Sequence, residues 1–247
     1  MAGAVEERLV AIATTDGAMK AFVAHPKRHG PFGAVVIVQH IGGLSEVMKE
    51  TARQVAREGF LAVVPALYHR LGDIVIDPVS KDPDVSAIRM IAVRSLRPPR
   101  VMADIKTTLA WLRTEASAAP GRRGLISYGG SAGLALLATA TFPQEIGAMA
   151  SILGLGFIKD GPDSPHLKID RVHAELYFGF AGEDEIIPTK DVDALAAMLA
   201  ASPVKHRIMV HPGVRHGYAF PERPVYDATA ATRDWAELRS LFERTLN

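Results

Sequence analysis

"LISYGGSAGLAL", residues 125–136, joins one apolar run to another through a glycine-rich turn. The first run predicts a buried strand and the second a helix, because glycines at the junction permit a tight change of direction. Gly129 and Gly133 flank Ser131 in the pattern Gly-x-Ser-x-Gly. This pattern is typical of a nucleophile elbow, a sharp turn that presents a catalytic side chain between a strand and a helix. Ser131 is therefore a candidate nucleophile, for which the chain must also supply a histidine and a carboxylate.

The rest of the chain has the periodicity of an α/β protein. Short, nearly continuous apolar runs predict parallel strands buried on both faces, and they cover residues 34–40, 60–66, 124–128, 147–153, 174–182 and 205–211. Apolar residues at helical spacing lie between most of these runs. Two β-prone runs around Asp16 and Gly17 predict an antiparallel hairpin at the sheet edge. We therefore expect a doubly wound, mostly parallel sheet with helices on both faces, in a single domain of residues 1–247.

The charge balance and the absence of cysteine limit the classes of function. Lysine and arginine total 28 against 27 aspartates and glutamates, with no basic block, so neither nucleic acid nor a membrane surface is indicated as a partner. A small-molecule substrate is expected, for a monomer or a small homo-oligomer. Without cysteine the chain has no disulfide, no thiolate metal site and no cysteine nucleophile. Charged residues 6–8 interrupt the segment where a signal peptide would need an apolar core, and a cytoplasmic location is expected.

Two further polar residues follow predicted strands, at the sheet edge where α/β proteins place their sites. Asp184 comes just after the strand 174–182, and His216 comes after the last strand. His216 is preferred over His211 as the base, because His211 lies at the strand end whereas a glycine follows His216 and gives its loop freedom. The order Ser131, Asp184, His216 is the one expected of α/β-hydrolases. In this hypothesis Ser131 attacks an acyl carbon, His216 moves the proton, and Asp184 orients the imidazole.

Four stretches together resemble the dienelactone hydrolase family of α/β-hydrolases; they are residues 35–70, 121–138, 178–188 and 211–242. The resemblance covers roughly residues 18–246. It implies a single-domain α/β-hydrolase fold without cofactor, acting on lactones or related esters through a Cys-His-Asp triad. No metal is expected either, because the sequence has no cysteine and no convincing cluster of metal ligands. Asp184 and His216 occupy the matching acid and histidine positions.

The position of the family's nucleophile is where this sequence departs from the pattern. The family cysteine sits in Gly-x-Cys-x-Gly-Gly, and an ungapped comparison places Gly129 at the cysteine. A shift by two residues instead gives Ser131 a complete Gly-x-Ser-x-Gly pattern, and the sequence leaves both registers open. The oxyanion hole, a pair of backbone N–H groups that binds the developing negative charge, would use Ile41 and Ala132 in the Ser131 register. Gly130 would replace Ala132 in the other register.

His40 stands where the family has a glutamate that engages the resting thiol. It could act as a second base, donate a hydrogen bond to a substrate carbonyl, or be a structural residue at a strand end.

Three arginines cluster where Pro98 and Pro99 mark the start of a helix; they are Arg94, Arg97 and Arg100. Arg94 and Arg97 could bind a substrate carboxylate, although a solvated basic turn accounts for them as well.

The family's arginine shortly after the histidine has no counterpart here, and Tyr218 follows His216 instead. This difference favours an acyl pocket that is lined by aromatic side chains and suits a less anionic substrate.

The leading hypothesis is a serine hydrolase that acts on a small ester, lactone or related acyl compound. One alternative is a lyase, isomerase or cyclase that uses His40 and His216 for acid–base chemistry. The other is a non-catalytic small-molecule binder on a hydrolase scaffold.

Overall fold

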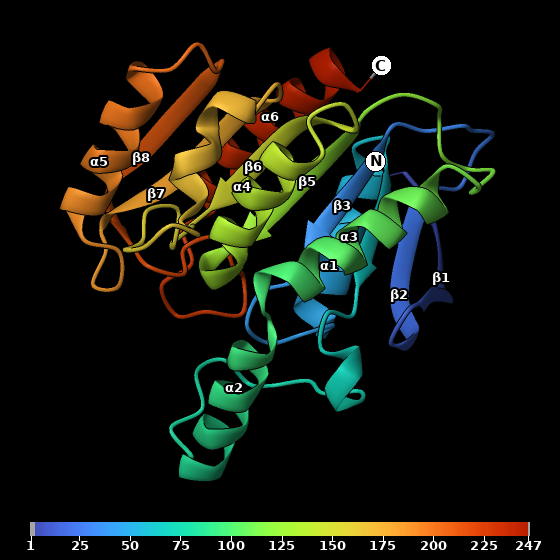
Figure 1. Cartoon of the computed structure of the whole chain (residues 1–247), viewed down its shortest axis with the longest axis horizontal. Coiled ribbons are helices and arrows are strands. Elements are labelled where there is room, and N and C mark those ends of the chain that lie inside the picture. Colours follow the sequence, from blue (N-terminus) through green and yellow to red (C-terminus); the bar gives the residue numbers. More distant parts are fainter. Residues whose placement is uncertain (1–2, 247) are drawn as a thin grey trace. The chain divides into compact units, whose positions relative to one another are not determined.

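The computed structural model describes residues 3–246 and contains two compact units, residues 1–123 and 124–247. Each unit combines strands with helices (Figure 1). The predicted apolar runs are buried along their whole length in β3 (Ala34–Val38), β4 (Leu61–Pro65), β5 (Arg123–Tyr128) and β6 (Ile146–Ile152). Burial on both faces explains why these strands do not alternate polar and apolar residues.

In the first unit the strand order is β1-β2-β4-β3. β1 (Val5–Thr14) and β2 (Gly17–Pro26) form the antiparallel hairpin that the sequence predicts. Gly17 closes its turn with a φ of +110°, a backbone conformation that suits glycine. β2 pairs antiparallel with β4, which pairs parallel with β3. The hairpin therefore forms one edge of this sheet.

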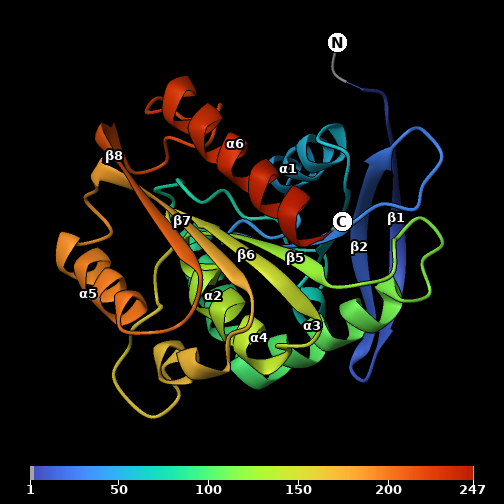
Figure 2. The ribbon, with the colours of Figure 1, turned by 90° about the horizontal axis from the view of Figure 1, so that it is seen from above.

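Two long helices cover the sheet of the first unit. α1 (Glu46–Arg57) and α3 (Pro98–Leu112) lie on opposite faces (Figure 2). Each buries the apolar stripe that its spacing predicts; the buried residues include Met48, Ala52 and Val55 in α1, and Ile105, Leu109 and Leu112 in α3.

A third helix of the first unit, α2 (Pro83–Ser95), lies between β4 and α3 along the chain, after a one-turn 3-10 helix at His69–Leu71. Asp82 caps α2, because its side chain accepts the backbone N–H groups of Asp84 and Val85. Ala92 is the one fully buried residue of α2. Most of this helix is therefore exposed.

In the second unit, β5, β6, β7 (Glu175–Glu183) and β8 (His206–Arg215) follow one another in chain order. β6 pairs parallel with β7, and β7 pairs parallel with β8. α6 (Ala228–Thr245) covers one face of this sheet, and α4 (Ala132–Thr141) and α5 (Thr189–Ala200) lie on the other (Figure 2). A 3-10 helix at Pro165–Arg171 lies between β6 and β7 along the chain. The carboxyl ends of β5, β7 and β8 thus lead into the three segments that the sequence marks for chemistry.

The predicted fold class is confirmed, including the N-terminal hairpin, the mostly parallel strands and the helices on both faces. The single domain of residues 1–247 stays a prediction.

Candidate active site

The strand-to-helix turn after β5 has its apex at Gly129. A 3-10 helix of one turn, Gly129–Ser131, connects β5 to α4. Gly129 has a φ of +55°, in the left-handed region that glycine adopts without steric penalty. Ser131 has a φ of −85° and a ψ of −6°, which is ordinary right-handed helical backbone. The unusual conformation that a sharp elbow requires therefore falls on Gly129.

The turn has open space beside its first two glycines and close packing at Gly133. A Cβ built on Gly129 meets no atom within 4 Å, and the same holds for Gly130. A Cβ on Gly133 would instead clash with the carbonyl of Gly156. The loop after β6 is bonded to the turn, since the N–H of Leu155 donates to the carbonyl of Gly129 at 3.1 Å and the N–H of Gly133 donates to the carbonyl of Leu155 at 3.2 Å. Gly133 is thus needed for close packing, whereas Gly129 faces open space.

Ser131 is held inside the turn. Its side chain is buried, and its Oγ donates to the carbonyl oxygen of Tyr128 at 3.1 Å. A serine hydroxyl bonded back to the carbonyl three residues earlier is a local side-chain contact of a helical turn. The geometry therefore gives the Ser131 hydroxyl a structural contact, and the nucleophilic role predicted for Ser131 stays a prediction.

Asp184 and His216 are in contact. Asp184 follows β7 and His216 follows β8, and Nδ1 of His216 lies 2.8 Å from Oδ2 and 3.0 Å from Oδ1 of Asp184. Oδ1 of Asp184 also accepts the backbone N–H groups of Ile186 and Ile187, both at 2.8 Å. The carboxylate is 3% exposed and the imidazole 23% exposed, so the acid is covered while the base can meet a ligand.

The surroundings of Asp184 keep it ionised. Burial by itself raises the pKa of a carboxyl group, but hydrogen bonds from His216, Ile187 and Ile186 outweigh burial and hold the pKa of Asp184 below its ordinary value. A carboxylate can only accept hydrogen bonds, so Nδ1 of His216 carries the proton of the shared bond. In neutral His216 the lone pair is therefore on Nε2, the nitrogen that a base uses.

The histidine loop lies beside the elbow. The ring of Phe220, four residues after His216, packs at 5.3 Å from the ring of Tyr128, the residue before Gly129. Tyr218 is completely buried and its hydroxyl donates to the buried carboxylate of Asp234. This side chain therefore anchors the loop to α6, and the role toward substrate predicted for Tyr218 stays a prediction.

The anchor of the histidine loop is a buried network that the sequence did not reveal. Asp234 accepts hydrogen bonds from the hydroxyls of Tyr177, at 2.6 Å, and Tyr218, and Nε2 of His211 lies 2.8 Å from its carboxylate. Burial and the charge of Asp234 raise the pKa of both tyrosines, so the two hydroxyls stay protonated. His211, the rejected candidate for the base, is a member of this network.

The residues predicted at the end of β3 make local contacts. Nδ1 of His40 accepts the backbone N–H of Gly42 at 2.8 Å, and the carbonyl of Ile41 accepts the hydroxyl of Tyr68 at 3.1 Å. Both bonds hold the loop after β3 in the first unit. The roles toward substrate assigned to His40 and Ile41 stay predictions.

The three arginines do not form a turn. Arg94 lies in the last turn of α2, Arg97 is the N-cap residue of α3, and Arg100 lies within α3. All three are exposed. The expected basic turn is thus the junction of two helices, and carboxylate binding by Arg94 and Arg97 stays a prediction.

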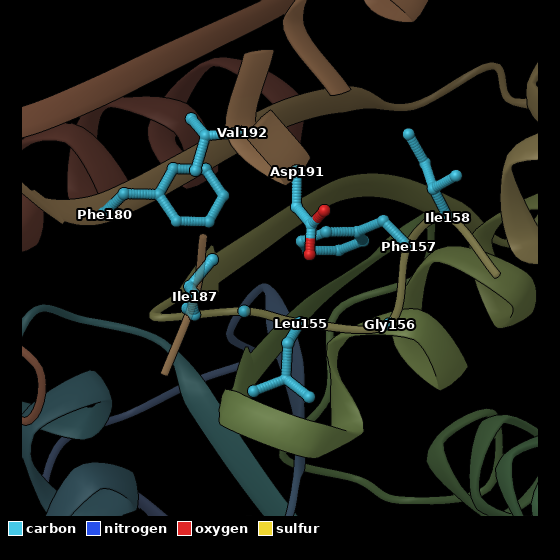
Figure 3. A pocket seen from close by; sticks show the side chains of 9 residues that line it. Leu155, Gly156, Phe157, Ile158, Phe180, Ile187, Asp191 and Val192 are labelled. Atoms are coloured by element: carbon cyan, nitrogen blue, oxygen red, sulfur yellow. The ribbon is translucent and has the colours of Figure 1, made fainter. Parts of the chain in front are cut away.

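A pocket adjoins both halves of the candidate site in the second unit (Figure 3). It is lined by Gly154, Leu155, Gly156, Phe157, Ile158, Phe180, Ile187, Asp191 and Val192. Leu155 is bonded to Gly129 at the elbow, and Ile187 is bonded to Asp184. Figure 3 shows the Asp191 carboxylate, the one charged group of the lining, directed toward the pocket interior. The other side chains of the lining are apolar.

Within residues 3–246, no group of three or more histidine, aspartate or glutamate side chains is arranged to hold a metal ion. Among the helices of the same residues, none has the length and apolar character that a membrane crossing requires.

A glycine elbow between strand and helix, an acid after β7 and a histidine after β8 define the class of protein as an α/β-hydrolase fold. A structure of a dienelactone hydrolase homologue from Klebsiella pneumoniae has this fold, with a TM-score of 0.86 at 24% sequence identity over 98% of this chain and 100% of the other. The sequence model of the dienelactone hydrolase family matches residues 19–246. The chain belongs to the dienelactone hydrolase family, which confirms the predicted family and its class as hydrolases.

Relatives with carboxymethylenebutenolidase in their names span nearly the whole chain. One from Synechocystis is 26% identical over 245 residues, which are 98% of both chains. One from Escherichia coli K12 is 28% identical over 232 residues, which are 92% of this chain and 82% of the relative.

Proposed function

We propose that this protein hydrolyses small esters or lactones with an uncharged, apolar acyl group, and that His216 activates the attacking water molecule. The observation that carries the proposal is the pairing of His216 with Asp184 beside an elbow whose apex, Gly129, has no side chain. Family membership supports the hydrolytic class, and the names of the relatives support lactone or ester substrates.

The proposed reaction uses one base and no covalent intermediate. Nε2 of His216 takes a proton from water while the water oxygen attacks the acyl carbon. The tetrahedral oxyanion accepts the backbone N–H of Gly130, the residue after the apex. The carbon–oxygen bond to the alcohol then breaks, and the imidazolium returns its proton to the leaving oxygen. An ester gives an acid and an alcohol, and a lactone gives one hydroxy acid.

Water is preferred as the nucleophile for a geometric reason. The elbow position that carries the nucleophile in this family has no side chain, and the space beside Gly129 is open. The Ser131 hydroxyl, two residues further, donates to the carbonyl of Tyr128 and is buried. A covalent mechanism would need Ser131 to leave this bond and turn outward.

The pocket supports the choice of substrate. Apolar side chains such as Phe157, Phe180 and Ile187 favour an apolar acyl group. The carboxylate of Asp191 repels a substrate that carries its own carboxylate. We therefore expect neutral esters and lactones to be better substrates than anionic ones.

Steady-state hydrolysis of a neutral p-nitrophenyl ester, a matched ester with a terminal carboxylate and a neutral lactone tests this function. His216→Ala should reduce kcat/KM by about a thousandfold or more, as expected on loss of a general base, while the exposed His173→Ala serves as the control. Asp191→Asn should raise kcat/KM for the anionic ester several-fold relative to the neutral one, whereas Asp193→Asn, outside the pocket lining, should not. Absence of hydrolysis of all three compounds by the wild-type protein would refute the function.

A further inference from the structure

α2 exposes an apolar face that no described part of its own unit covers. Ile88, Met90 and Ile91 are 47%, 51% and 61% exposed. The opposite side of the helix is packed, because Ala92 and Val85 contact a small core that contains Tyr68 and Ile76. Figure 1 shows α2 set apart from the strands of its unit. Isolated exposed apolar residues are common, but three large ones within four residues of one helix indicate an interaction surface.

The spacing along this face is that of a helix–helix seam. Asp84, Ala87, Ile91 and Arg94 follow one another at intervals of three, four and three residues, so they lie along one ridge of α2. Ala87 is small enough to allow close approach of another helix. The ridge begins with an acid in the first turn and ends with a base in the last turn.

We propose that this ridge, Asp84, Ala87, Ile91 and Arg94, pairs antiparallel with the same ridge of a second copy of the chain. A twofold axis between the helices places Asp84 against Arg94 of the second copy, and Arg94 against Asp84 of the second copy. The same axis places Ala87 against Ile91 of the second copy. The ridge is thus complementary to itself in charge and in size, which is what an isologous dimer contact requires.

The charge pattern favours a second copy over a lipid surface. Helices that lie on membranes carry lysine and arginine along the face next to the apolar one. The other arginine of α2, Arg89, lies off the ridge and donates to the carbonyls of Pro78 and Ser80. The charges of the ridge are therefore Asp84 at one end and Arg94 at the other, an arrangement that an antiparallel partner matches. A contact made by one helix of 13 residues belongs to the small, weak class of interfaces, so a dimer that dissociates on dilution is expected.

Sedimentation equilibrium over a range of protein concentrations tests the proposal with charge reversals. Asp84→Arg alone and Arg94→Asp alone each place like charges at both ends of the contact, and each should weaken dimerisation by about tenfold or more. An equimolar mixture of the two variants should dimerise again, because each heterodimer restores two opposite pairs. High salt should weaken the wild-type dimer.

Ile91→Asp and Val93→Asp provide matched apolar variants. Val93 is also exposed, at 40%, but lies off the ridge, so only Ile91→Asp should abolish the dimer. Circular dichroism and thermal denaturation check that each variant is folded. A wild-type protein that stays monomeric at the highest attainable concentration would overturn the proposal, as would a dimer indifferent to both charge reversals. Co-sedimentation of the monomer with phosphatidylcholine–phosphatidylglycerol vesicles, lost in Ile91→Asp, would assign the face to lipid instead.

Discussion

Nδ1 of His216 lies 2.8 Å from Oδ2 of Asp184, although 31 residues separate the two in the chain. The carboxylate of Asp184 is nearly inaccessible to solvent and also accepts two backbone N–H groups. Its position therefore does not depend on the hydrogen bond to His216. Asp184 can therefore determine both the orientation of the imidazole and the nitrogen that carries its proton.

Asp184→Asn tests this relationship. The amide keeps the size of the side chain but can donate its own hydrogen bond, so it can support the wrong imidazole tautomer. We expect kcat to fall by roughly a hundredfold to ten-thousandfold. The neighbouring Glu185, which pairs with Arg215 at the surface, provides the control. Equal, small effects of Asp184→Asn and Glu185→Gln would remove Asp184 from the site.

The lowered pKa of Asp184 predicts a pH-dependent contribution to stability. The folded-state pKa lies below the unfolded value. The contribution is therefore complete above the unfolded pKa, about 3.9, and is lost as the pH falls through the folded pKa. The difference in free energy of unfolding between wild type and Asp184→Asn should shrink as the pH is lowered below about 5. Urea denaturation at each pH measures it, and a constant difference would contradict the assigned ionisation.

Substitution of the two tyrosines bonded to Asp234 distinguishes an effect on the stability of the fold from an effect on the position of His216. Tyr177→Phe and Tyr218→Phe each remove one hydroxyl donor to the same buried carboxylate, at an expected cost of about 1–3 kcal/mol. Only Tyr218 lies in the loop of His216. Tyr218→Phe should therefore lower kcat roughly tenfold through misplacement of the base, with little effect from Tyr177→Phe. Thermal denaturation and kinetics of both variants check this, and parallel losses of kcat would indicate a purely structural network.

Gly129→Cys tests the position of the elbow apex. A side chain at a φ of +55° costs about 1–3 kcal/mol, so a lower melting temperature is expected. The new thiol would stand at the N-terminal end of α4 in open space, where a thiolate is favoured. It should react rapidly with iodoacetamide and produce a burst of p-nitrophenol. Ser131→Cys is the control, and faster alkylation there than at position 129 would move the apex to residue 131.

The strands and the acid–histidine pair could be predicted because local sequence determines them. Runs such as 34–38 and 61–65 are apolar throughout, which marks strands buried on both faces. Asp184 and His216 each follow such a strand directly, and parallel strands bring their carboxyl ends to the same edge.

The features that the sequence did not determine depend on backbone geometry or distant contacts. Small residues surround both Gly129 and Ser131, so composition permits an apex at either, and only the φ angles distinguish them. α2 buries only Ala92 completely and leaves Ile88 and Ile91 exposed, so the rule that apolar residues face the core does not place this helix. The contact between Tyr177 and Asp234 joins residues 57 positions apart, beyond the reach of local patterns.

The measurement that tests the central claim most directly is intact-mass spectrometry of the catalytically active protein after treatment with a fluorophosphonate. This reagent adds covalently to a serine nucleophile next to an oxyanion hole, because it mimics the tetrahedral centre. With Gly129 at the apex and water as the nucleophile, we expect an unmodified mass while ester hydrolysis continues, and Ser131→Ala should keep most of the wild-type rate. The account would be contradicted by a single adduct that maps to Ser131 and abolishes turnover, provided that the Ser131→Ala variant forms no adduct.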